Sequence, residues 1–234
     1  GRSWPRDLAK TEAYKFPPHA FGGVVMIKLE NEELKRRAKQ LKLLILDVDG
    51  VLTEGELILI GEDLEAKRFF IHDGMGIIFL RSVGIKLAII SGRVSPMVRR
   101  RAEELKIDEV SEGFFFKQDG VETLLQKLNI EAHEAAYVGD DIHDVPAMKI
   151  VGLPIAVANA RPEAKDHSVY VTTTPGGHGA VRELAEWLLE LRGEKESVFA
   201  QYLQTSQEKE ANHISRPDVS VLPSYSIKDG ASAT

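Results

Sequence analysis

The feature that most constrains the fold is an aliphatic run, residues 43–50, that ends in two carboxylates and a glycine. The four aliphatic residues Leu43 to Leu46 predict a strand buried on both faces, as in the interior of a parallel sheet. Asp47 and Asp49 follow it, and side chains two positions apart on a regular strand point to the same face. Two like charges this close repel each other unless a cation lies between them, so the pattern indicates a divalent metal. The alternative is a strand that ends in a solvated turn, since Asp and Gly are common turn residues.

Strands and helices alternate with short links from residue 42 to residue 193, which predicts a doubly wound, mostly parallel α/β sheet of Rossmann-like type. After the first strand, residues 56–60 and 65–71 flank Gly61-Glu62-Asp63 and predict an inserted β-hairpin. The other expected strands are residues 86–90, 109–111, 135–138, 154–157 and 169–171, and the expected helices are residues 73–83, 95–106, 118–128, 142–149 and 178–191.

The chain of 234 residues favours one α/β domain with extensions over two full domains. Residues 1–41 are expected to form an N-terminal extension that contains a charged helix from about Glu32 to Leu41. Residues 42–193 are expected to form the core. Residues 194–234 are polar and then rich in Ser, Pro and Gly, so we expect a weakly ordered tail.

The composition excludes several classes of function. A formal net charge of −6 argues against a general nucleic-acid surface, which needs a basic stripe. The absence of cysteine excludes disulfides, thiol catalysis and Cys-ligated zinc, and it fits a reducing cytoplasm. No apolar run approaches the ~20 residues that span a bilayer, and the first residues lack the charged-then-apolar pattern of a signal peptide. We therefore expect a cytoplasmic protein with no nucleic-acid and no membrane partner.

Three further strand ends carry polar side chains. Ser91 follows the second aliphatic strand, Lys117 precedes a helix, and residues 139–144 place an acidic cluster after a later strand. Each has an ordinary alternative, namely a turn, a surface lysine and an acidic helix N-cap. Ligands of open α/β sheets bind at the carboxyl ends of the strands, so four such strand ends together favour a binding site there.

The ordered set Asp47-Val48-Asp49-Gly50, Ser91, Lys117 and Gly139-Asp140-Asp141 resembles that of the haloacid dehalogenase superfamily of aspartate-nucleophile phosphatases. Five segments are similar to those of the 3-deoxy-D-manno-octulosonate 8-phosphate phosphatases, and related phosphatases of nine-carbon sugar acid 9-phosphates share them. These segments are residues 46–53, 71–76, 90–93, 138–141 and 176–183. The resemblance covers residues 42–192 and neither extension.

The resemblance implies a phosphoric monoester hydrolase with Mg²⁺ as cofactor, acting on a phosphorylated sugar acid in lipopolysaccharide precursor synthesis. Asp47 would be the nucleophile, and Asp49 would protonate the leaving oxygen and later deprotonate a water molecule. Oxygen ligands without cysteine or a histidine pair favour Mg²⁺ over zinc.

The expected metal-site residues are Asp47, Asp49 (through its backbone carbonyl) and Asp140, and the expected phosphate-binding residues are Ser91 and Lys117. The expected substrate-binding residues are Asp73, Gly74, Arg93 and Arg101, and further candidates are Gly92, His72, His178, and Asp141 or Asp144 acting on the metal through water.

The spacing of the motifs leaves no room for a cap domain. Residues 50–90 already hold a hairpin and a helix, and residues 118–139 hold a helix and a strand. A phosphorylated intermediate still needs shelter from stray water. The resemblance implies a homotetramer whose hairpins pack centrally and whose neighbouring copies close each site with the hairpin end and the segment Gly176–Gly179.

Three positions depart from the pattern of the octulosonate enzymes, which commonly have Asn, Arg and Arg where this chain has Phe70, His72 and His178. All three concern sugar recognition or closure of the site, so the reaction is better supported than the substrate. A phosphatase of a nine-carbon sugar acid 9-phosphate is the alternative within this class. Alternatives from other classes are a phospho-receiver domain, which lacks a counterpart of Asp49, and a non-catalytic oligomerisation module, which the intact motifs argue against.

Overall fold

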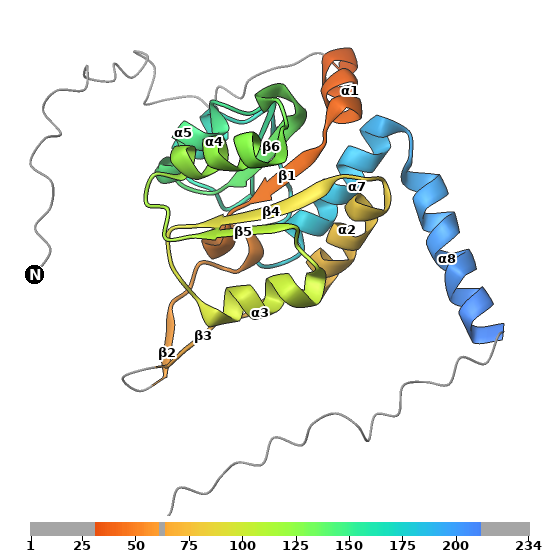
Figure 1. The fold of residues 1–234 in the computed structure, drawn as a ribbon, viewed down its shortest axis with the longest axis horizontal. Coiled ribbons are helices and arrows are strands. Elements are labelled where there is room, and N and C mark those ends of the chain that lie inside the picture. Colours follow the sequence, from red (N-terminus) through yellow and green to blue (C-terminus); the bar gives the residue numbers. More distant parts are fainter. Residues whose placement is uncertain (1–30, 61–63, 212–234) are drawn as a thin grey trace, which may run out of the picture. The chain divides into compact units, whose positions relative to one another are not determined.

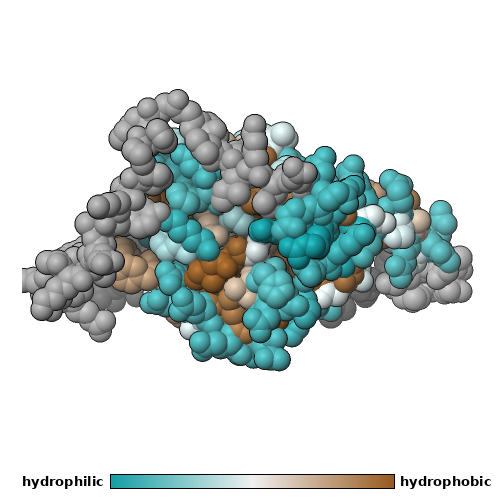
Figure 2. Space-filling view, turned by 90° about the horizontal axis from the view of Figure 1, so that it is seen from above, coloured by the Kyte–Doolittle hydropathy of each residue, from teal (hydrophilic) through white to brown (hydrophobic). Residues whose placement is uncertain are grey.

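The computed structural model describes residues 31–60 and 64–211 (Figure 1). The chain divides into a larger unit that ends at Glu194 and a second unit that begins at Lys195, and each is described by itself. Much of the surface in Figure 2 is hydrophilic, with a compact group of exposed hydrophobic residues near its middle. No helix in the described part of the chain is long and apolar enough to cross a membrane.

The larger unit is built on a six-stranded sheet in the order β5-β4-β1-β6-β7-β8, with every neighbouring pair parallel. Its strands are β1 (Leu43–Leu46), β4 (Lys86–Ser91), β5 (Glu109–Glu112), β6 (Ala135–Gly139), β7 (Leu153–Ala156) and β8 (Tyr170–Val171). The four residues of β1 are fully buried between β4 and β6, which confirms the predicted doubly wound parallel sheet.

Helices cover both faces of the sheet (Figure 1). The helix α2 packs along α7, which also contacts α1, while α4 contacts α5 and α5 contacts α6. The helices of this unit are α1 (Asn31–Gln40), α2 (Ile71–Ser82), α3 (Pro96–Leu105), α4 (Lys117–Leu128), α5 (Val145–Met148), α6 (Pro162–Asp166) and α7 (Ala180–Arg192). Short helical turns cover Val48–Leu52, Ala132–Glu134 and Ile142–Asp144. The helix α6 was not predicted, because five residues are too few to show a helical period.

The predicted hairpin is present but shorter than expected. The strands β2 (Ile58–Ile60) and β3 (Leu64–Ala66) are antiparallel, with Ile58 opposite Ala66. The predicted turn, residues 61–63, lies outside the described residues. The chain after β3 runs without strand pairing to Phe70, and α2 then begins two residues before the position predicted from the sequence.

The second unit differs from the expected weakly ordered tail, because it contains the helix α8 (Lys195–Ala211). This segment holds no Gly or Pro and is rich in Lys, Glu, Gln and Ala, which favour helix. The weak periodicity of its apolar residues is the reason that no helix was predicted there. Residues 1–30 and 212–234, which include most of both predicted extensions, lie outside the described residues.

Candidate active site

Two carboxylates meet at the carboxyl end of the sheet, because β1 and β6 are neighbours in register. Asp47 follows β1 and Asp140 follows β6, with Leu46 paired with Val138. Gly50 has a φ of +105°, and a side chain there would overlap the carboxylate of Asp140. Only glycine therefore allows the loop after β1 to pass so close to this carboxylate.

One oxygen of each carboxylate has no partner. Asp47 Oδ2 and Asp140 Oδ1 are buried and accept no hydrogen bond from the described residues. Burial raises the pKa of Asp47 to about 7, against the effect of the nearby Lys117 charge. Burial, and then the charges of Asp47 and Asp144, raise the pKa of Asp140 to about 8. Free oxygens on two buried, mutually repelling carboxylates fit a hard divalent cation such as Mg²⁺.

Lys117 lies beside Asp47 as the first residue of α4, with its side chain almost completely buried. Its Nζ atom lies 2.7 Å from Asp47 Oδ1 and 2.6 Å from Asp144 Oδ1. Burial lowers the pKa of this amine, but the two carboxylates outweigh burial and the pKa of Lys117 is raised. The lysine is thus held as a cation against the predicted nucleophile.

Asp144 joins Lys117, Tyr137 and the loop that carries Asp140. It is fully buried, and its carboxylate accepts hydrogen bonds from Lys117 Nζ, from Tyr137 Oη at 2.7 Å, and from the backbone N–H groups of Asp140 at 2.9 Å and Asp141 at 3.1 Å. Burial raises the pKa of Asp144, but the positive charge of Lys117 and these hydrogen bonds leave it lowered. The sequence suggested a metal role through water for Asp144, whereas the structure engages its carboxylate fully with Lys117 and with the loop that carries Asp140.

Tyr137 was not predicted as a site residue. It lies in β6, fully buried, and its hydroxyl reaches the same Asp144 oxygen that accepts from Lys117. The only signal in the sequence was a hydroxyl within a strand expected to be buried, where a buried phenol requires a partner. Asp141, by contrast, is half exposed and accepts from Ile142 N at 2.6 Å, as in the ordinary acidic helix N-cap.

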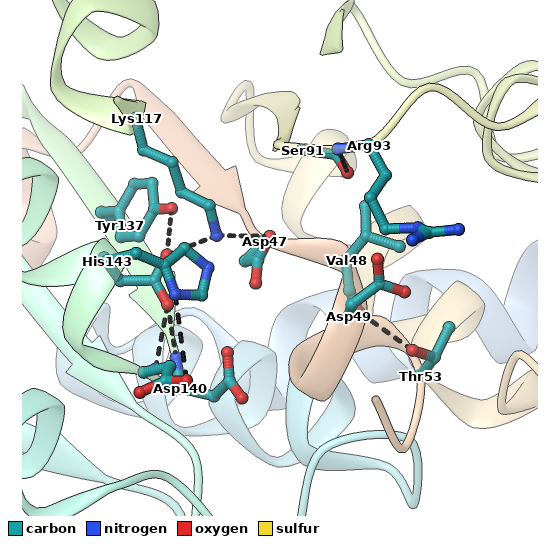
Figure 3. A network of polar contacts seen from close by, with 12 residues as sticks. Asp47, Val48, Asp49, Thr53, Ser91, Arg93, Lys117, Tyr137, Asp140 and His143 are labelled. Carbon is teal, nitrogen blue, oxygen red and sulfur yellow. Dashed lines mark hydrogen bonds and ion pairs between the residues drawn. The ribbon is translucent and has the colours of Figure 1, made fainter. Parts of the chain in front are cut away.

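Asp49 lies on the other side of Asp47 from Lys117 (Figure 3). It sits in the kinked turn after β1 and is partly exposed. Its Oδ1 atom lies 2.5 Å from the amine of Lys67, a residue after the hairpin whose side chain is almost completely buried. Lys67 was also missed, because a lysine near a hairpin is ordinarily a surface residue.

Ser91 is buried at the end of β4, where its hydroxyl accepts from the backbone N–H of Arg93 at 3.2 Å. Gly92 between them is exposed and leaves room for a side chain. The guanidinium of Arg93 is half exposed and pairs with Glu65 Oε2 at 2.9 Å. Ser91 thus belongs to the same strand-end region as Asp47, while Arg93 reaches back to the hairpin.

Asp73, predicted to bind substrate, is buried against the start of α7. Its buried carboxylate accepts from the backbone N–H of Arg182 in the first turn of α7, so it caps a helix from a neighbouring element. A side chain at Gly74 would press on Arg101 and Leu105, which places Arg101 against the start of α2. Arg101 also pairs with Glu104 on its own helix at 3.2 Å.

His72 and His178 both lie beside the aromatic ring of Phe70. The rings of Phe70 and His72 meet edge to face with centroids 5.1 Å apart, and the rings of Phe70 and His178 lie 6.4 Å apart. His178 Nε2 also lies 3.6 Å from Glu54 Oε2. The three positions that depart from the octulosonate pattern therefore form one cluster in this chain.

The segment Gly176–Gly179 packs on its own chain. Gly177 N donates to Val51 O at 3.0 Å, and a side chain at Gly176 would overlap the carbonyl of Gly50. The sequence predicted that this segment reaches the site of a neighbouring copy. In the structure the segment packs against the loop that carries Asp49 in its own chain.

Comparison with known proteins gives a consistent result. The model of the haloacid dehalogenase-like hydrolase family matches residues 109–184. The chain is 40% identical over 169 residues to the 3-deoxy-D-manno-octulosonate 8-phosphate phosphatase KdsC of Escherichia coli (strain B / BL21-DE3), covering 72% of this chain and 90% of that protein. It is 37% identical over 166 residues to KdsC of Haemophilus influenzae, and the match covers 71% of this chain and 92% of that protein.

Solved structures agree. One is the crystal structure of 3-deoxy-D-manno-octulosonate 8-phosphate phosphatase from Moraxella catarrhalis in complex with a magnesium ion, a phosphate ion and KDO. It has a TM-score of 0.71 and 40% identity, and covers 73% of this chain and 98% of that chain. Another is the cobalt-bound form of the Haemophilus influenzae enzyme, with a TM-score of 0.66 and 36% identity. This match covers 68% of this chain and 93% of that chain.

The fold and the strand-end carboxylates thus define a phosphatase of the haloacid dehalogenase-like class. Within that class, this chain belongs to the family of the 3-deoxy-D-manno-octulosonate 8-phosphate phosphatases.

Proposed function

We propose that this phosphatase hydrolyses 3-deoxy-D-manno-octulosonate 8-phosphate to the free sugar acid and phosphate, with Mg²⁺ as cofactor. The observation that carries the proposal is the buried Asp47, which has one oxygen paired with Lys117 and the other free beside Asp140. The named relatives act on this substrate, and they cover most of the larger unit.

Asp47, Asp140 and the backbone carbonyl of Asp49 are the proposed holders of Mg²⁺. The unpartnered oxygens Asp47 Oδ2 and Asp140 Oδ1 support this set. When bound, the cation would offset the negative charge of the two carboxylates and of the phosphoryl group.

In the first step, an Asp47 oxygen forms a bond to phosphorus while the bond from phosphorus to the sugar oxygen breaks. Lys117 and Ser91 hold the non-bridging oxygens, whose negative charge grows in the transition state. Asp49 gives its proton to the leaving sugar oxygen, because an alkoxide is a poor leaving group. The products of this step are the sugar acid and an aspartyl-phosphate at Asp47.

In the second step, Asp49 takes a proton from water, and the water oxygen forms a bond to phosphorus as the bond to Asp47 breaks. This proton restores the acid form of Asp49, and inorganic phosphate is released. The amine of Lys67 lies against Asp49 and orients it for both proton transfers.

The proposed substrate surface comprises Arg93 and Arg101, which would bind the sugar carboxylate, together with the cluster of Phe70, His72 and His178. A guanidinium can bind a carboxylate through two parallel hydrogen bonds. In this chain both arginines already pair with a carboxylate, Arg93 with Glu65 and Arg101 with Glu104.

We also propose that the enzyme is a homotetramer whose neighbouring copies cover each site. The hairpin supports this arrangement, because Leu57, Leu59 and Ile60 are 53%, 67% and 53% exposed. A group of exposed apolar side chains marks a protein interaction surface more often than a surface that faces solvent. Sedimentation velocity of the full chain tests this part, and a fully active monomer would contradict it.

A substrate panel tests the proposed function. Values of kcat/KM with Mg²⁺ are compared for 3-deoxy-D-manno-octulosonate 8-phosphate, a nine-carbon sugar acid 9-phosphate and glucose 6-phosphate, with Asp47→Asn as the inactive control. One charged hydrogen bond to the carboxylate predicts a preference of about 10- to 100-fold for the octulosonate over glucose 6-phosphate. A preference for the nine-carbon acid would move the substrate to that class, and equal values for all three would remove the substrate claim.

A further inference from the structure

His143 lies in the active site, although neither the sequence motifs nor the mechanism above uses it. It is the middle residue of the helical turn Ile142–Asp144, between the half-exposed Asp141 and the buried Asp144. Asp141 Oδ1 accepts from Ile142 N, and Asp144 Oδ2 accepts from Asp141 N, so the backbone that carries His143 is fixed. The imidazole is 47% exposed and projects from this turn toward Lys117 and Asp47 (Figure 3).

We propose that His143 is a catalytic residue that hydrogen-bonds a non-bridging oxygen of the phosphoryl group beside Lys117. One of its ring nitrogens lies within 4.8 Å of a carboxylate oxygen of Asp47. The two side chains make no direct hydrogen bond with each other. An oxygen of a phosphoryl group on Asp47 fits between them, since a hydrogen bond spans about 3 Å.

The ring is available for such a contact. Within the described part of the chain, neither nitrogen of His143 makes a hydrogen bond, and its one ion-pair contact is with Asp141 Oδ2, 4.0 Å from Nδ1. Burial and then the charge of Lys117 lower the pKa of His143, while Asp144 and Asp141 act in the opposite direction. A neutral imidazole still offers one N–H donor, which is what a phosphoryl oxygen needs.

A direct metal role for His143 is a poorer fit. His143, Asp47 and Asp144 each offer a ligand atom within 4.8 Å of the others, but Asp144 already accepts hydrogen bonds from Lys117, Tyr137 and two backbone N–H groups. A cation there would have to displace Lys117 from this carboxylate. Lys117 itself is shared between two carboxylates, so a second donor next to it would strengthen phosphate binding.

The inference rests on the proposed function, and its test also includes a binding measurement that needs no turnover. Inorganic phosphate is titrated into the full-length chain in excess Mg²⁺ by calorimetry, and kcat and KM are measured with an aryl phosphate. The variants are His143→Ala and His143→Asn, because Asn keeps a donor. The controls are His133→Ala and His133→Asn, the same changes at an exposed histidine in the turn before β6.

We expect His143→Ala to weaken phosphate binding and to lower kcat/KM by about 10- to 100-fold, with His143→Asn between Ala and wild type. The His133 variants, the melting temperature and the Mg²⁺ concentration for half-maximal activity should stay unchanged. Unchanged phosphate binding in His143→Ala, or a shifted Mg²⁺ requirement as the main effect, would overturn the inference. A wild-type chain that binds phosphate but hydrolyses no phosphate ester would instead overturn the proposed function.

Discussion

Two parts of the active site are built in different ways. The acidic centre, defined as Asp47, Lys117, Asp140 and Asp144, is buried or partly buried. Its lysine lies 2.7 Å from Asp47 and 2.6 Å from Asp144, and one buried oxygen of Asp47 and one of Asp140 accept no hydrogen bond from the described residues. The rim, defined as His72, Arg93, Arg101 and His178, lies nearer to solvent. Arg93, Arg101 and His178 each lie beside a glutamate of the same chain.

Under the proposed function, this difference separates the residues that carry out phosphoryl transfer from the residues that select the substrate. A buried charge that loses its partner is costly, so the acidic centre has essentially one stable arrangement, and that arrangement serves phosphoryl transfer. Exposed ion pairs contribute at most about 1 kcal/mol, so a substrate carboxylate can replace Glu65 or Glu104 at little cost. Under the proposed function, the acidic centre carries out the phosphoryl transfer, while the rim can adapt to the substrate.

The largest effect is expected from Asp144→Asn, which tests whether the acidic centre is one unit. The change removes a buried negative charge from Lys117 and disturbs the loop that carries Asp140. We expect a loss of about 3 kcal/mol in the free energy of unfolding by urea and a fall in kcat of about 100-fold or more. Asp141→Asn is the matched control, since Asp141 is half exposed, and equal effects of the two variants would contradict the proposed unit.

A smaller, pH-dependent effect is expected from Asp73→Asn, which tests whether Asp73 belongs to the packing or to the rim. Burial raises the pKa of Asp73 from 3.8 to about 6, against the backbone N–H groups of α7 and the nearby Arg101 and His72 charges. The folded state thus binds this proton more tightly than the unfolded state, so the stability from this group is present at low pH and is lost as the pH rises through about 6.

Between pH 5 and pH 7.5, wild type should therefore lose about 1 kcal/mol of unfolding free energy relative to Asp73→Asn. Urea unfolding at the two pH values measures this difference. A large rise in KM for the sugar acid phosphate, with no pH-dependent change in stability, would place Asp73 on the rim instead.

The smallest effect on stability is expected from Glu65→Gln, which frees Arg93 on the rim. Loss of this exposed pair should change the free energy of unfolding by less than about 1 kcal/mol. The KM for 3-deoxy-D-manno-octulosonate 8-phosphate should change several-fold, while kcat for an aryl phosphate stays constant. Glu109→Gln is the control, because it breaks the exposed pair with Lys127 on another part of the surface. An equal loss of kcat on both substrates in Glu65→Gln would show that the rim also serves the chemistry.

The sheet and the order of the strand-end residues could be predicted from the sequence alone. Leu43 to Leu46 predicted a strand buried on both faces, and the alternation of strands and helices predicted a parallel sheet, and both are present. Because parallel strands end at the same edge, the positions of Asp47, Ser91 and Asp140 could be predicted from local pattern alone.

The partners of those residues depend on how distant elements pack together. Asp144 pairs with Lys117 and accepts a hydrogen bond from Tyr137, Lys67 pairs with Asp49, and Asp73 caps α7. None of these contacts has a local sequence signal that names the partner. Periodicity reports which face of an element is buried, but it does not report which side chain of a distant element lies opposite. A hydrogen bond depends on that second fact to within fractions of an ångström, and only the packed fold supplies it.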